Sequence, residues 1–320
     1  MNNPKISIIC PVYNAASCIG QTLDSLLKQT FQDFEILCVD DGSKDNSVEI
    51  LNQYAKNDAR IRVFQKPNGK TAARVVSFAL PYCMGKYYFF VSHDDLFSED
   101  LLETLYARAE ETGAEKVICD VLLWHENEPE KDVRLGAPNG DHSVILNGEE
   151  AFKLMVDGWK IPGCGLKDLK SFRESGFYDH WFNGDEFSGW LHTLRCKKVA
   201  FASGTYFYRQ TPTAVTKKIS PLLFETLCTD VELLEFVEKL DKKKWNAFLV
   251  KRMKSLISEL RTAHKHLKNK CGNFTNEERI RTQKIIKDVE SKLFKMICRA
   301  TTGLTKILLI VRFVYKLKIS

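Results

Sequence analysis

The chain has 320 residues, of which 44% are hydrophobic and 28% charged, and a formal net charge of +6. This is the composition of a soluble globular protein with room for one large domain and an appended region, or for two domains. It contains no run of about 18 apolar residues and no basic segment followed by a long apolar one, so we expect neither an ordinary transmembrane helix nor a signal peptide. The ten cysteines stand singly, without a C-x-x-C pair, and are interpreted as reduced thiols in a reducing compartment.

Strand and helix patterns alternate along the first 124 residues. Continuous apolar runs predict buried strands, and apolar residues at helical spacing predict the helices between them. The strands are expected at Lys5–Val12, Phe34–Val39, Ile61–Phe64, Lys86–Val91 and Lys116–Trp124, and the helices at Asn14–Gln29, Val48–Lys56, Thr71–Leu80 and Glu99–Thr112. This alternation predicts an α/β fold in which helices flank a mostly parallel sheet.

The rest of the chain changes character twice. Residues 125–147 are polar and predict a loop or a hairpin, and residues 148–216 mix helix and strand signals. From Leu222 onward the pattern is almost entirely helical. We therefore predict one domain over residues 1–219 and a helical C-terminal region over residues 220–320.

Polar side chains follow the predicted strand ends. Asn14 follows the first strand, the pair Asp40–Asp41 the second, and the pair Asp94–Asp95 the fourth. Taken singly, such an Asp often caps the next helix, and a lone Arg74 is more often solvated or in an ion pair. Because ligands bind beyond the carboxyl ends of parallel strands, the whole set favours a ligand site at that edge.

The adjacent carboxylates of Asp94 and Asp95 repel each other and need a partner. The chain has no G-x-G-x-x-G after the first strand and no P-loop, which argues against a dinucleotide site and a Walker-type site. A nucleotide diphosphate without a glycine-rich cradle needs a divalent cation to neutralise it. Mg²⁺ and Mn²⁺ take one or two carboxylates together with phosphate oxygens, so this pair suits a metal-bound diphosphate.

The order of four motifs resembles that of family 2 glycosyltransferases with the GT-A fold. These motifs are SIICPVYNA, TLDSLLKQTFQDFEILCVDDGSKDNS, NGKTAARVVSFAL and GKYYFFVSHDD. The resemblance is close over residues 5–124 and looser to about residue 219, through NGDEFSGW and YFYRQTPTAVTKKIS. It implies that residues 1–124 form a nucleotide-binding half and residues 125–219 an acceptor half of one GT-A catalytic domain.

The resemblance also implies an activity. We expect an inverting, metal-dependent enzyme that moves a sugar from a nucleotide diphosphate, with UDP favoured, to a glycan or lipid-linked glycan in surface polysaccharide synthesis. The cation would be Mn²⁺ or Mg²⁺. The chain lacks the Q-x-x-R-W sequence that accompanies processive members, so we expect single sugar addition.

Individual residues match the family's motifs. Those expected near the nucleotide sugar are Pro11, Tyr13, Asn14, Asp41, Arg74, Ser92, His93 and Asp94, with Asp41 in the base-binding position. Asp94 and Asp95 match the metal-binding D-x-D element. Asp185 matches the general base, with Glu186 as the near alternative. The candidates for the acceptor site or a lid are Trp190, Tyr208, Arg209 and Gln210.

The chain departs from the family at one position. Many members carry D-S-D-D where this chain has Ser92-His93-Asp94-Asp95, so the first carboxylate is missing. We expect metal dependence to persist, with an altered metal preference or altered donor contacts. His93 is interpreted as a structural or donor-side group and not as a ligand, because the site is otherwise built from oxygen.

The C-terminal region is strongly basic. From Lys242 to Ser320 there are 21 Lys and Arg against 5 Asp and Glu, a net charge of +16, which leaves −10 for the residues before it. Residues 304–320 predict a basic amphipathic helix at an anionic membrane surface, in preference to a helix that packs on the protein with its basic heads in water. We therefore expect a cytoplasmic protein attached peripherally to the inner face of the membrane, without nucleic acid as a partner, and leave a homo-oligomer open.

Two rival interpretations remain at this point. One is a non-catalytic α/β binding module anchored by its basic tail. The other is a nucleotidyltransferase, which usually has a glycine-rich basic loop near its N-terminus, and VYNAASCIG is not such a loop.

Overall fold

The chain divides into two compact units. The computed structural model describes residues 3–211, 218–300 and 303–318. One unit consists of Met1–His180 and Gly184–Thr211, and the other of Trp181–Asn183 and Pro212–Ser320.

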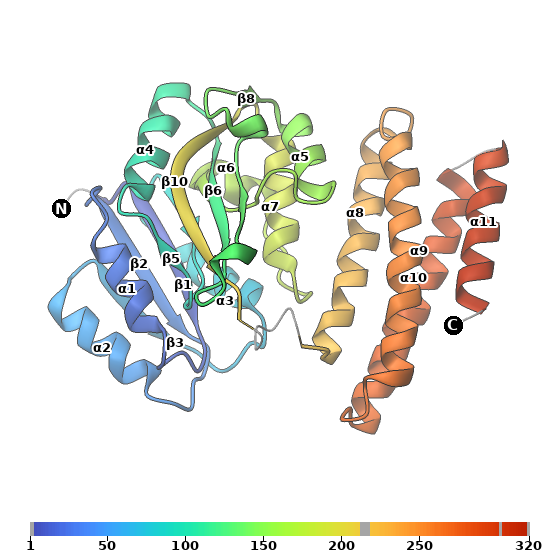
Figure 1. The fold of residues 1–320 in the computed structure, drawn as a ribbon, viewed down its shortest axis with the longest axis horizontal. Coiled ribbons are helices and arrows are strands. Elements are labelled where there is room, and N and C mark those ends of the chain that lie inside the picture. The colour runs from blue at the N-terminus through green and yellow to red at the C-terminus, as the bar shows by residue number, and fades with distance from the viewer. Residues whose placement is uncertain (1–2, 212–217, 301–302, 319–320) are drawn as a thin grey trace. The chain divides into compact units, whose positions relative to one another are not determined.

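Within the described residues, the strands of the first unit form one ten-stranded sheet (Figure 1). They are β1 (Ile6–Val12), β2 (Phe34–Asp40), β3 (Ile61–Gln65), β4 (Tyr87–Phe90), β5 (Leu96–Phe97), β6 (Lys116–Trp124), β7 (Val133–Leu135), β8 (Ile145–Leu146), β9 (Gly165–Asp168) and β10 (Val199–Arg209). Their order is β3-β2-β1-β4-β9-β6-β10-β5, with β7 paired to β6 and β8 to β10. The strands β1, β2, β3, β4, β6 and β10 run in one direction and the short β5, β7, β8 and β9 in the other, so the mostly parallel sheet is confirmed.

Helices cover both faces of this sheet, as predicted. They are α1 (Ile19–Leu27), α2 (Ser47–Asn57), α3 (Ala72–Ala79), α4 (Leu101–Thr112), α5 (Gly148–Val156), α6 (Leu169–Ser175) and α7 (Gly184–Arg195), with short 3-10 turns at Leu80–Tyr82, Pro129–Lys131 and Pro138–Gly140. Side chains of a strand alternate between faces. Ile8 and Cys10 of β1 therefore pack with α1, α2 and α4, whereas Ile9 packs with α3 and α6.

The first helix begins later than the sequence pattern predicted. It was expected from Asn14, but α1 starts at Ile19. Asn14 has a left-handed φ of 48°, its amide donates to Ser43 Oγ at 2.9 Å, and its Oδ1 accepts from the Lys44 amide at 2.8 Å. Side-chain bonds of this kind offer the backbone an alternative to the helix, and here they tie the loop after β1 to the loop after β2.

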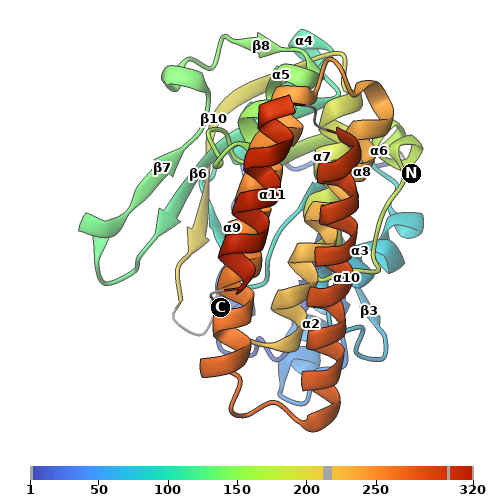
Figure 2. The same cartoon turned by 90° about the vertical axis from the view of Figure 1, so that its right-hand side faces the viewer.

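The second unit is helical. Its elements are a 3-10 turn at Pro221–Glu225 and the helices α8 (Thr226–Asp241), α9 (Asn246–Asn269), α10 (Asn276–Ala300) and α11 (Gly303–Lys318), and Figure 2 shows α9, α10 and α11 side by side. Its core consists of aliphatic side chains such as Leu256 of α9, Leu293 of α10 and Leu309 of α11. Among the described residues, no helix is long and apolar enough to cross a membrane.

The last helix exposes apolar side chains, whereas two of its basic side chains bond to the helical unit. Lys306 donates to the carbonyl oxygen of Cys298 at 2.6 Å, and Arg312 lies 3.5 Å from Ser258 Oγ, so both basic heads bond to the helical unit itself. Large apolar side chains are instead the exposed ones, namely Ile307, Leu308, Val311 and Val314. The side chains of residues 315–320, which belong to the predicted membrane-binding stretch, lie outside the described residues.

Candidate active site

The candidate residues gather at the carboxyl ends of the parallel strands. The loop after β1 contains Tyr13 and Asn14, and the loop after β2 contains Asp41. The segment after β3 leads to Arg74 in the first turn of α3, and the segment after β4 contains Asp94. Since these strands run in the same direction, their ends meet at one edge, where α/β sheets bind ligands.

The two acids after β2 have different environments. Asp40 accepts from the amides of Gly42 and Ser43 at 3.1 and 3.2 Å, which shapes the turn. Asp41 is buried, and its Oδ1 accepts from Lys66 Nζ at 2.6 Å and from the Gly69 amide at 2.8 Å. Both of these bonds go to Oδ1, which leaves Oδ2 of Asp41 for a ligand.

Gly69 allows the loop after β3 to approach Asp41. A β-carbon at this position would lie 2.8 Å from Lys66 Nζ and 3.1 Å from the β-carbon of Arg74. Arg74 itself is exposed, and its Nη1 donates to the Gly69 carbonyl oxygen at 2.9 Å. Thr71 is the N-cap of α3, and its side chain accepts from the Arg74 amide. Arg74 therefore lies in the first turn of a capped helix.

The loop after β1 contacts residues Ser92–Asp95, here called the SHDD segment, through His93. Its Nδ1 lies 3.1 Å from the Pro11 carbonyl oxygen, and because a carbonyl only accepts, Nδ1 carries the proton. Pro11 is buried in β1, whereas Tyr13 is 42% exposed and available to a ligand. His93 therefore connects the end of β1 to the segment after β4.

The two neighbouring carboxylates of the SHDD segment point to different environments. Asp95 is fully buried, its Oδ2 accepts from the Tyr206 hydroxyl at 2.6 Å, and its Oδ1 accepts from the Arg209 amide at 2.8 Å. Burial, together with the nearby Asp94, raises the pKa of Asp95 to about 7. The Tyr206 hydroxyl also accepts from the Ser92 amide at 3.1 Å. Asp95 is thus committed to the protein, and Asp94 is the half-buried carboxylate of the pair.

These hydrogen bonds distinguish the two predicted metal ligands. Among the described residues, no group of three or more His, Cys, Asp or Glu side chains gathers as a metal site. A Mg²⁺ or Mn²⁺ that bridges a diphosphate needs only one or two protein carboxylates, with phosphate oxygens and water completing the shell. The residues fit that pattern through Asp94, whereas Asp95, predicted as a second ligand, uses both oxygens in bonds to β10.

Arg209 ties the SHDD segment to two other elements. Its Nε donates to the Asp94 carbonyl oxygen at 2.8 Å, its Nη1 to Glu126 at 2.6 Å, and its Nη2 to Gln21 of α1 at 2.7 Å. Its guanidinium also lies 4.7 Å from the centre of the Trp124 ring. Each guanidinium nitrogen therefore donates to a partner, and Arg209 clamps the segment after β4 to Glu126 and to α1.

The remaining candidates of the YRQ segment lie beside this clamp. Tyr208 is half-buried and packs against the core of the sheet, and the Gln210 amide donates to the Trp124 carbonyl oxygen at 2.8 Å. The Gln210 side chain is half-buried, and its Nε2 lies 3.4 Å from the Tyr208 carbonyl oxygen.

The predicted general base begins α7. Asp185 and Glu186 occupy its first turn and are half-buried. A β-carbon at Gly184 would lie 3.4 Å from the β-carbon of Ala73, so the start of α7 reaches the start of α3 and its Arg74. Burial raises the pKa of Asp185, and hydrogen bonds from the Asp185 and Glu186 amides, followed by the charge of Lys167, oppose that rise. Trp190, a candidate for the acceptor site or a lid, is 7% exposed.

Some residues that shape the site were not predicted from the sequence. Thr22 of α1 holds the segment with its Oγ1, 2.8 Å from the His93 carbonyl oxygen and 2.9 Å from that of Asp95. Tyr206 lies inside β10 and has no local signature. Lys66, the partner of Asp41, follows directly after β3, so its place at a strand end could have indicated it.

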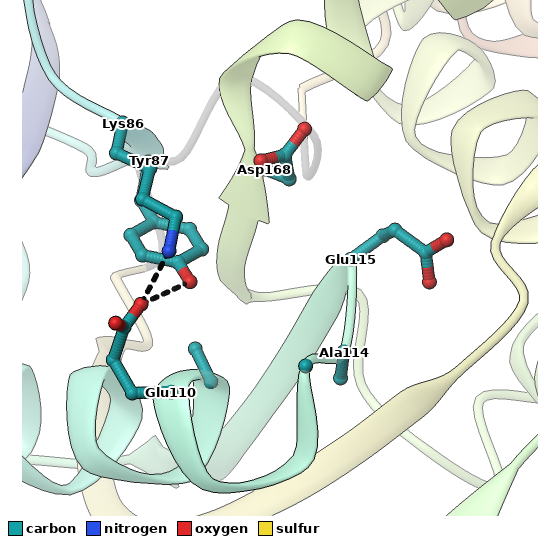
Figure 3. A pocket seen from close by; sticks show the side chains of 8 residues that line it. Lys86, Tyr87, Glu110, Ala114, Glu115 and Asp168 are labelled. Carbon is teal, nitrogen blue, oxygen red and sulfur yellow. Dashed lines mark hydrogen bonds and ion pairs between the residues drawn. The ribbon is translucent and has the colours of Figure 1, made fainter.

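A shallow pocket of about 170 Å³ lies elsewhere on the first unit (Figure 3). There Lys86 and Tyr87 both donate to Glu110 Oε1, at 2.6 and 2.7 Å. Lys86 and Glu115 of this pocket precede β4 and β6. The pocket is therefore at the amino ends of the strands and is not part of the candidate site.

Comparisons with known proteins agree with this geometry. The family model described as "Glycosyl transferase family 2" matches residues 7–164. The glycosyltransferase GlyG of Streptococcus pneumoniae serotype 4 is 36% identical over 214 residues, which is 64% of this chain and 70% of GlyG. The uncharacterized glycosyltransferase EpsJ of Bacillus subtilis is 42% identical over 117 residues, 36% of this chain and 33% of EpsJ.

A solved structure shares the fold. Residues 1–349 of S. aureus TarS, crystallised with UDP-GlcNAc, superpose with a TM-score of 0.71 at 16% identity, covering 98% of this chain and 88% of that one. The predicted GT-A class is thereby confirmed. The sequence matches to named glycosyltransferases set aside the non-catalytic binding module and the nucleotidyltransferase. The chain belongs to family 2 of the glycosyltransferases and is an enzyme of that family.

Proposed function

We propose that this enzyme transfers a sugar from a UDP-sugar to a hydroxyl group of a glycan or lipid-linked glycan, with inversion at the anomeric carbon. The observation that carries the proposal is the arrangement of Asp41, Asp94 and Asp185. They come from three separate segments that meet at the carboxyl edge of one sheet. Each has the environment that its role needs.

Nucleotide binding is proposed at Asp41. Lys66 and Gly69 donate to its Oδ1, and we assign its Oδ2 the role of accepting from a base N–H such as that of uracil. Tyr13 and Arg74 are exposed on the flanking loops and supply an aromatic face and a cation for the nucleotide. A TarS structure with UDP-GlcNAc, which has the same fold, makes UDP-GlcNAc the first donor to test.

A divalent cation is proposed at Asp94. Its half-buried carboxylate and the donor's phosphate oxygens are the hard ligands that Mg²⁺ and Mn²⁺ prefer. When bound, such a cation stabilises the negative charge that develops on the leaving diphosphate. The missing first acid at Ser92 and the inward turn of Asp95 leave this chain with one carboxylate for that purpose.

Asp185 is proposed as the general base. An alcohol is a weak nucleophile, so a carboxylate must accept its proton as its oxygen attacks the anomeric carbon. The bond from that carbon to the diphosphate oxygen breaks in the same step, and one displacement inverts the configuration. The raised pKa of Asp185 suits proton acceptance near neutral pH, and Glu186 in the same turn is the alternative.

A membrane surface is proposed as the location of the acceptor. The face of α11 formed by Ile307, Leu308, Val311 and Val314 is exposed and apolar. Exposed lysines are frequent on α10, where they include Lys284, Lys287, Lys292 and Lys295. An apolar helix face together with basic side chains is the combination that binds an anionic membrane interface. A lipid-linked acceptor for surface polysaccharide synthesis would lie at the inner face of that membrane.

The release of UDP from a panel of UDP-sugars, with UDP-GlcNAc first, tests the proposal. We expect release that requires Mn²⁺ or Mg²⁺ and that increases with a glycan acceptor. D185N should lose turnover while it retains UDP affinity, since Asp185 acts on the acceptor and not on the nucleotide. An intact, metal-supplied enzyme that neither binds nor cleaves any UDP-sugar would overturn the proposal, and equal loss of binding and turnover in D185N would remove Asp185 as the base.

A further inference from the structure

The chain leaves the first unit for three residues just before the candidate base. His180 and Gly184 belong to the first unit, whereas Trp181–Asn183 belong to the helical unit. Asp185 follows two residues after this excursion, in the first turn of α7. Residues 179–183, here called the α7 entry loop, therefore have a tip that is part of the helical unit and an end that leads directly to the candidate base.

Within the first unit, the two ends of the entry loop are bound to each other. The Tyr178 amide donates to Ser188 Oγ at 2.9 Å, and the Ser188 hydroxyl donates to the Gly184 carbonyl oxygen at 2.7 Å. A β-carbon at Gly184 would lie 2.2 Å from the Tyr178 carbonyl oxygen, so the approach requires glycine. Ser188 is fully buried, and the Tyr178 ring packs against the edge of the Phe187 ring with centroids 5.0 Å apart. The loop is thus closed where it begins and ends.

Within the helical unit, α8 binds the tip of the entry loop at two points. Trp181 Nε1 donates to Glu232 Oε1 at 2.7 Å, and the Thr229 hydroxyl donates to Asn183 Oδ1 at 2.6 Å. Thr229 and Glu232 are three residues apart and therefore lie on one face of α8. Thr229 is fully buried, and a hydrogen bond to a carboxylate such as that of Glu232 is stronger than one to a neutral acceptor.

These bonds matter because the first turn of a helix is its least constrained part. Its first four N–H groups have no acceptor within the helix, so groups outside the helix decide how well that turn is ordered. Asp185 stands in this turn, one peptide bond after Gly184. With the entry loop closed at its ends and bound to α8 at its tip, the chain reaches Asp185 from two fixed points.

We propose that Thr229 and Glu232 of α8 are positioning residues, which hold the α7 entry loop and thereby fix the Asp185 carboxylate for the acceptor hydroxyl. This inference rests on the proposed role of Asp185 as the base. Neither residue of α8 touches the reacting atoms in this scheme. They act through Trp181 and Asn183, so the helical unit contributes to catalysis as well as to the proposed membrane attachment.

The hold on the entry loop can be measured without turnover. W181F removes the indole N–H and keeps an aromatic ring, and T229V removes the hydroxyl at nearly constant volume. In the full-length protein, hydrogen exchange is followed at the amides of residues 188–190, which bond to the carbonyl oxygens of the first turn of α7. We expect exchange there to accelerate by about fivefold in each variant, the factor that corresponds to one lost hydrogen bond. T229S retains the hydroxyl and should exchange as the unsubstituted protein does.

Turnover then shows whether this hold serves the base. For cleavage of UDP-GlcNAc with Mn²⁺ and a glycan acceptor, we expect kcat to fall by about tenfold or more in W181F and T229V, since a displacement on the order of 1 Å costs about 100-fold. UDP affinity, measured by calorimetry, should stay unchanged, because the nucleotide is assigned to other segments. T229S should restore kcat. E232A removes the bond of W181F from its other partner, so the two effects should not add.

E238A is the matched control. Glu238 lies on the same helix, and its Oε2 accepts from Arg299 Nε of α10 at 3.0 Å. The substitution removes a carboxylate and an ion pair from the helical unit but no bond to the entry loop. We expect its exchange at residues 188–190 and its kcat to match those of the unsubstituted protein. If W181F does not fold, as judged by its unfolding transition, E232A takes its place.

The outcomes separate this inference from the proposed function. Unchanged exchange in the folded W181F and T229V proteins overturns the hold by α8, and so does an equal acceleration in E238A. Faster exchange with an unchanged kcat, or with an equal loss of UDP affinity, overturns the positioning role, whereas faster exchange with a lower kcat alone supports it. If the unsubstituted enzyme cleaves no UDP-sugar, the proposed function fails, and the exchange of these amides still decides whether α8 holds the start of α7.

Discussion

Arg209 holds both residues of the Asp94–Asp95 pair: its amide donates to Asp95 Oδ1 and its guanidinium Nε to the Asp94 carbonyl oxygen, each at 2.8 Å. Only 11% of the Arg209 side chain is exposed. The last residue of β10 thus fixes a segment more than 110 positions earlier in the chain. The other two guanidinium nitrogens of Arg209 donate to the side chains of Glu126 and Gln21.

Removal of this clamp should reduce catalysis more than folding. In R209A the Asp94 carboxylate loses its fixed position, and a displacement on the order of 1 Å costs about 100-fold in rate. R209K retains a charge but lacks the planar group that reaches three partners, so it should recover little. Cleavage of UDP-GlcNAc over a series of Mn²⁺ concentrations measures both the rate and the metal requirement. E126A is the matched control, since it removes only the outer partner. An R209A enzyme with an unchanged rate and metal dependence would contradict the clamp.

The two acids of the SHDD segment should respond differently to substitution. D95A leaves the buried Tyr206 hydroxyl and the Arg209 amide without their acceptor, at about 1–3 kcal/mol each in unfolding free energy. D94A, at a half-buried position, should change that free energy by about 0.5 kcal/mol or less while it weakens Mn²⁺ binding. Urea unfolding and calorimetric Mn²⁺ titration in the presence of UDP measure the two effects. A D94A protein that binds Mn²⁺ as tightly as before would remove Asp94 as the ligand.

Lys116 should make stability depend on pH above neutrality. Its folded pKa is lowered to about 7, below that of an exposed lysine, because burial and the nearby charge of Lys167 destabilise the ammonium. Its hydrogen bonds within the described residues go to neutral groups, Thr193 Oγ1 and Met155 Sδ. The unfolded chain therefore binds more protons between about pH 7 and 10, and the Lys116 contribution to stability rises with pH across that window and is lowest below it. At about 1.4 kcal/mol per unit the penalty near pH 7 is on the order of 4 kcal/mol.

The comparison of K116M with the unsubstituted protein isolates this effect. K116M removes the buried charge, so the difference between the two unfolding free energies should be largest near pH 7 and shrink toward pH 10. Chemical unfolding across this range gives both curves under the same conditions. A difference that stays constant with pH would show that Lys116 is not titrating in the folded state.

The exposed face of α11 provides a test of membrane attachment. I307E and V311E place charge on exposed positions of that face and should leave folding unchanged while they reduce binding to vesicles that contain phosphatidylglycerol. T305E, on an exposed polar position of the same helix, is the matched control. Co-sedimentation with anionic and neutral vesicles measures binding. Unchanged binding would exclude this face, and a loss of self-association in sedimentation experiments would instead identify a second copy of the chain as its partner.

Local patterns were enough to locate most of the candidate site. The apolar runs that became β1, β2 and β4 end in polar residues, and a parallel sheet necessarily brings such ends to one edge. Asp41 and Asp94 could be placed there because their positions depend only on strand ends that are visible within a few residues. The same reasoning could not describe residues 148–216, where β9 and α6 are short, β10 has a register shift, and the pairing of β9 and β10 is set by distant strands.

The sequence by itself determined the α/β class, the carboxylates at the strand ends and the family of this enzyme, because those follow from periodicity and from motifs read over short spans. Only the tertiary structure decided that Asp95 turns inward to Tyr206 while Asp94 stays half-buried, and that Arg209 holds both residues of the pair. The physical reason is that the burial and hydrogen-bond partners of a polar side chain come from segments far away in the chain. Two adjacent aspartates look alike until β10 supplies the hydroxyl and the amide that bind one of them.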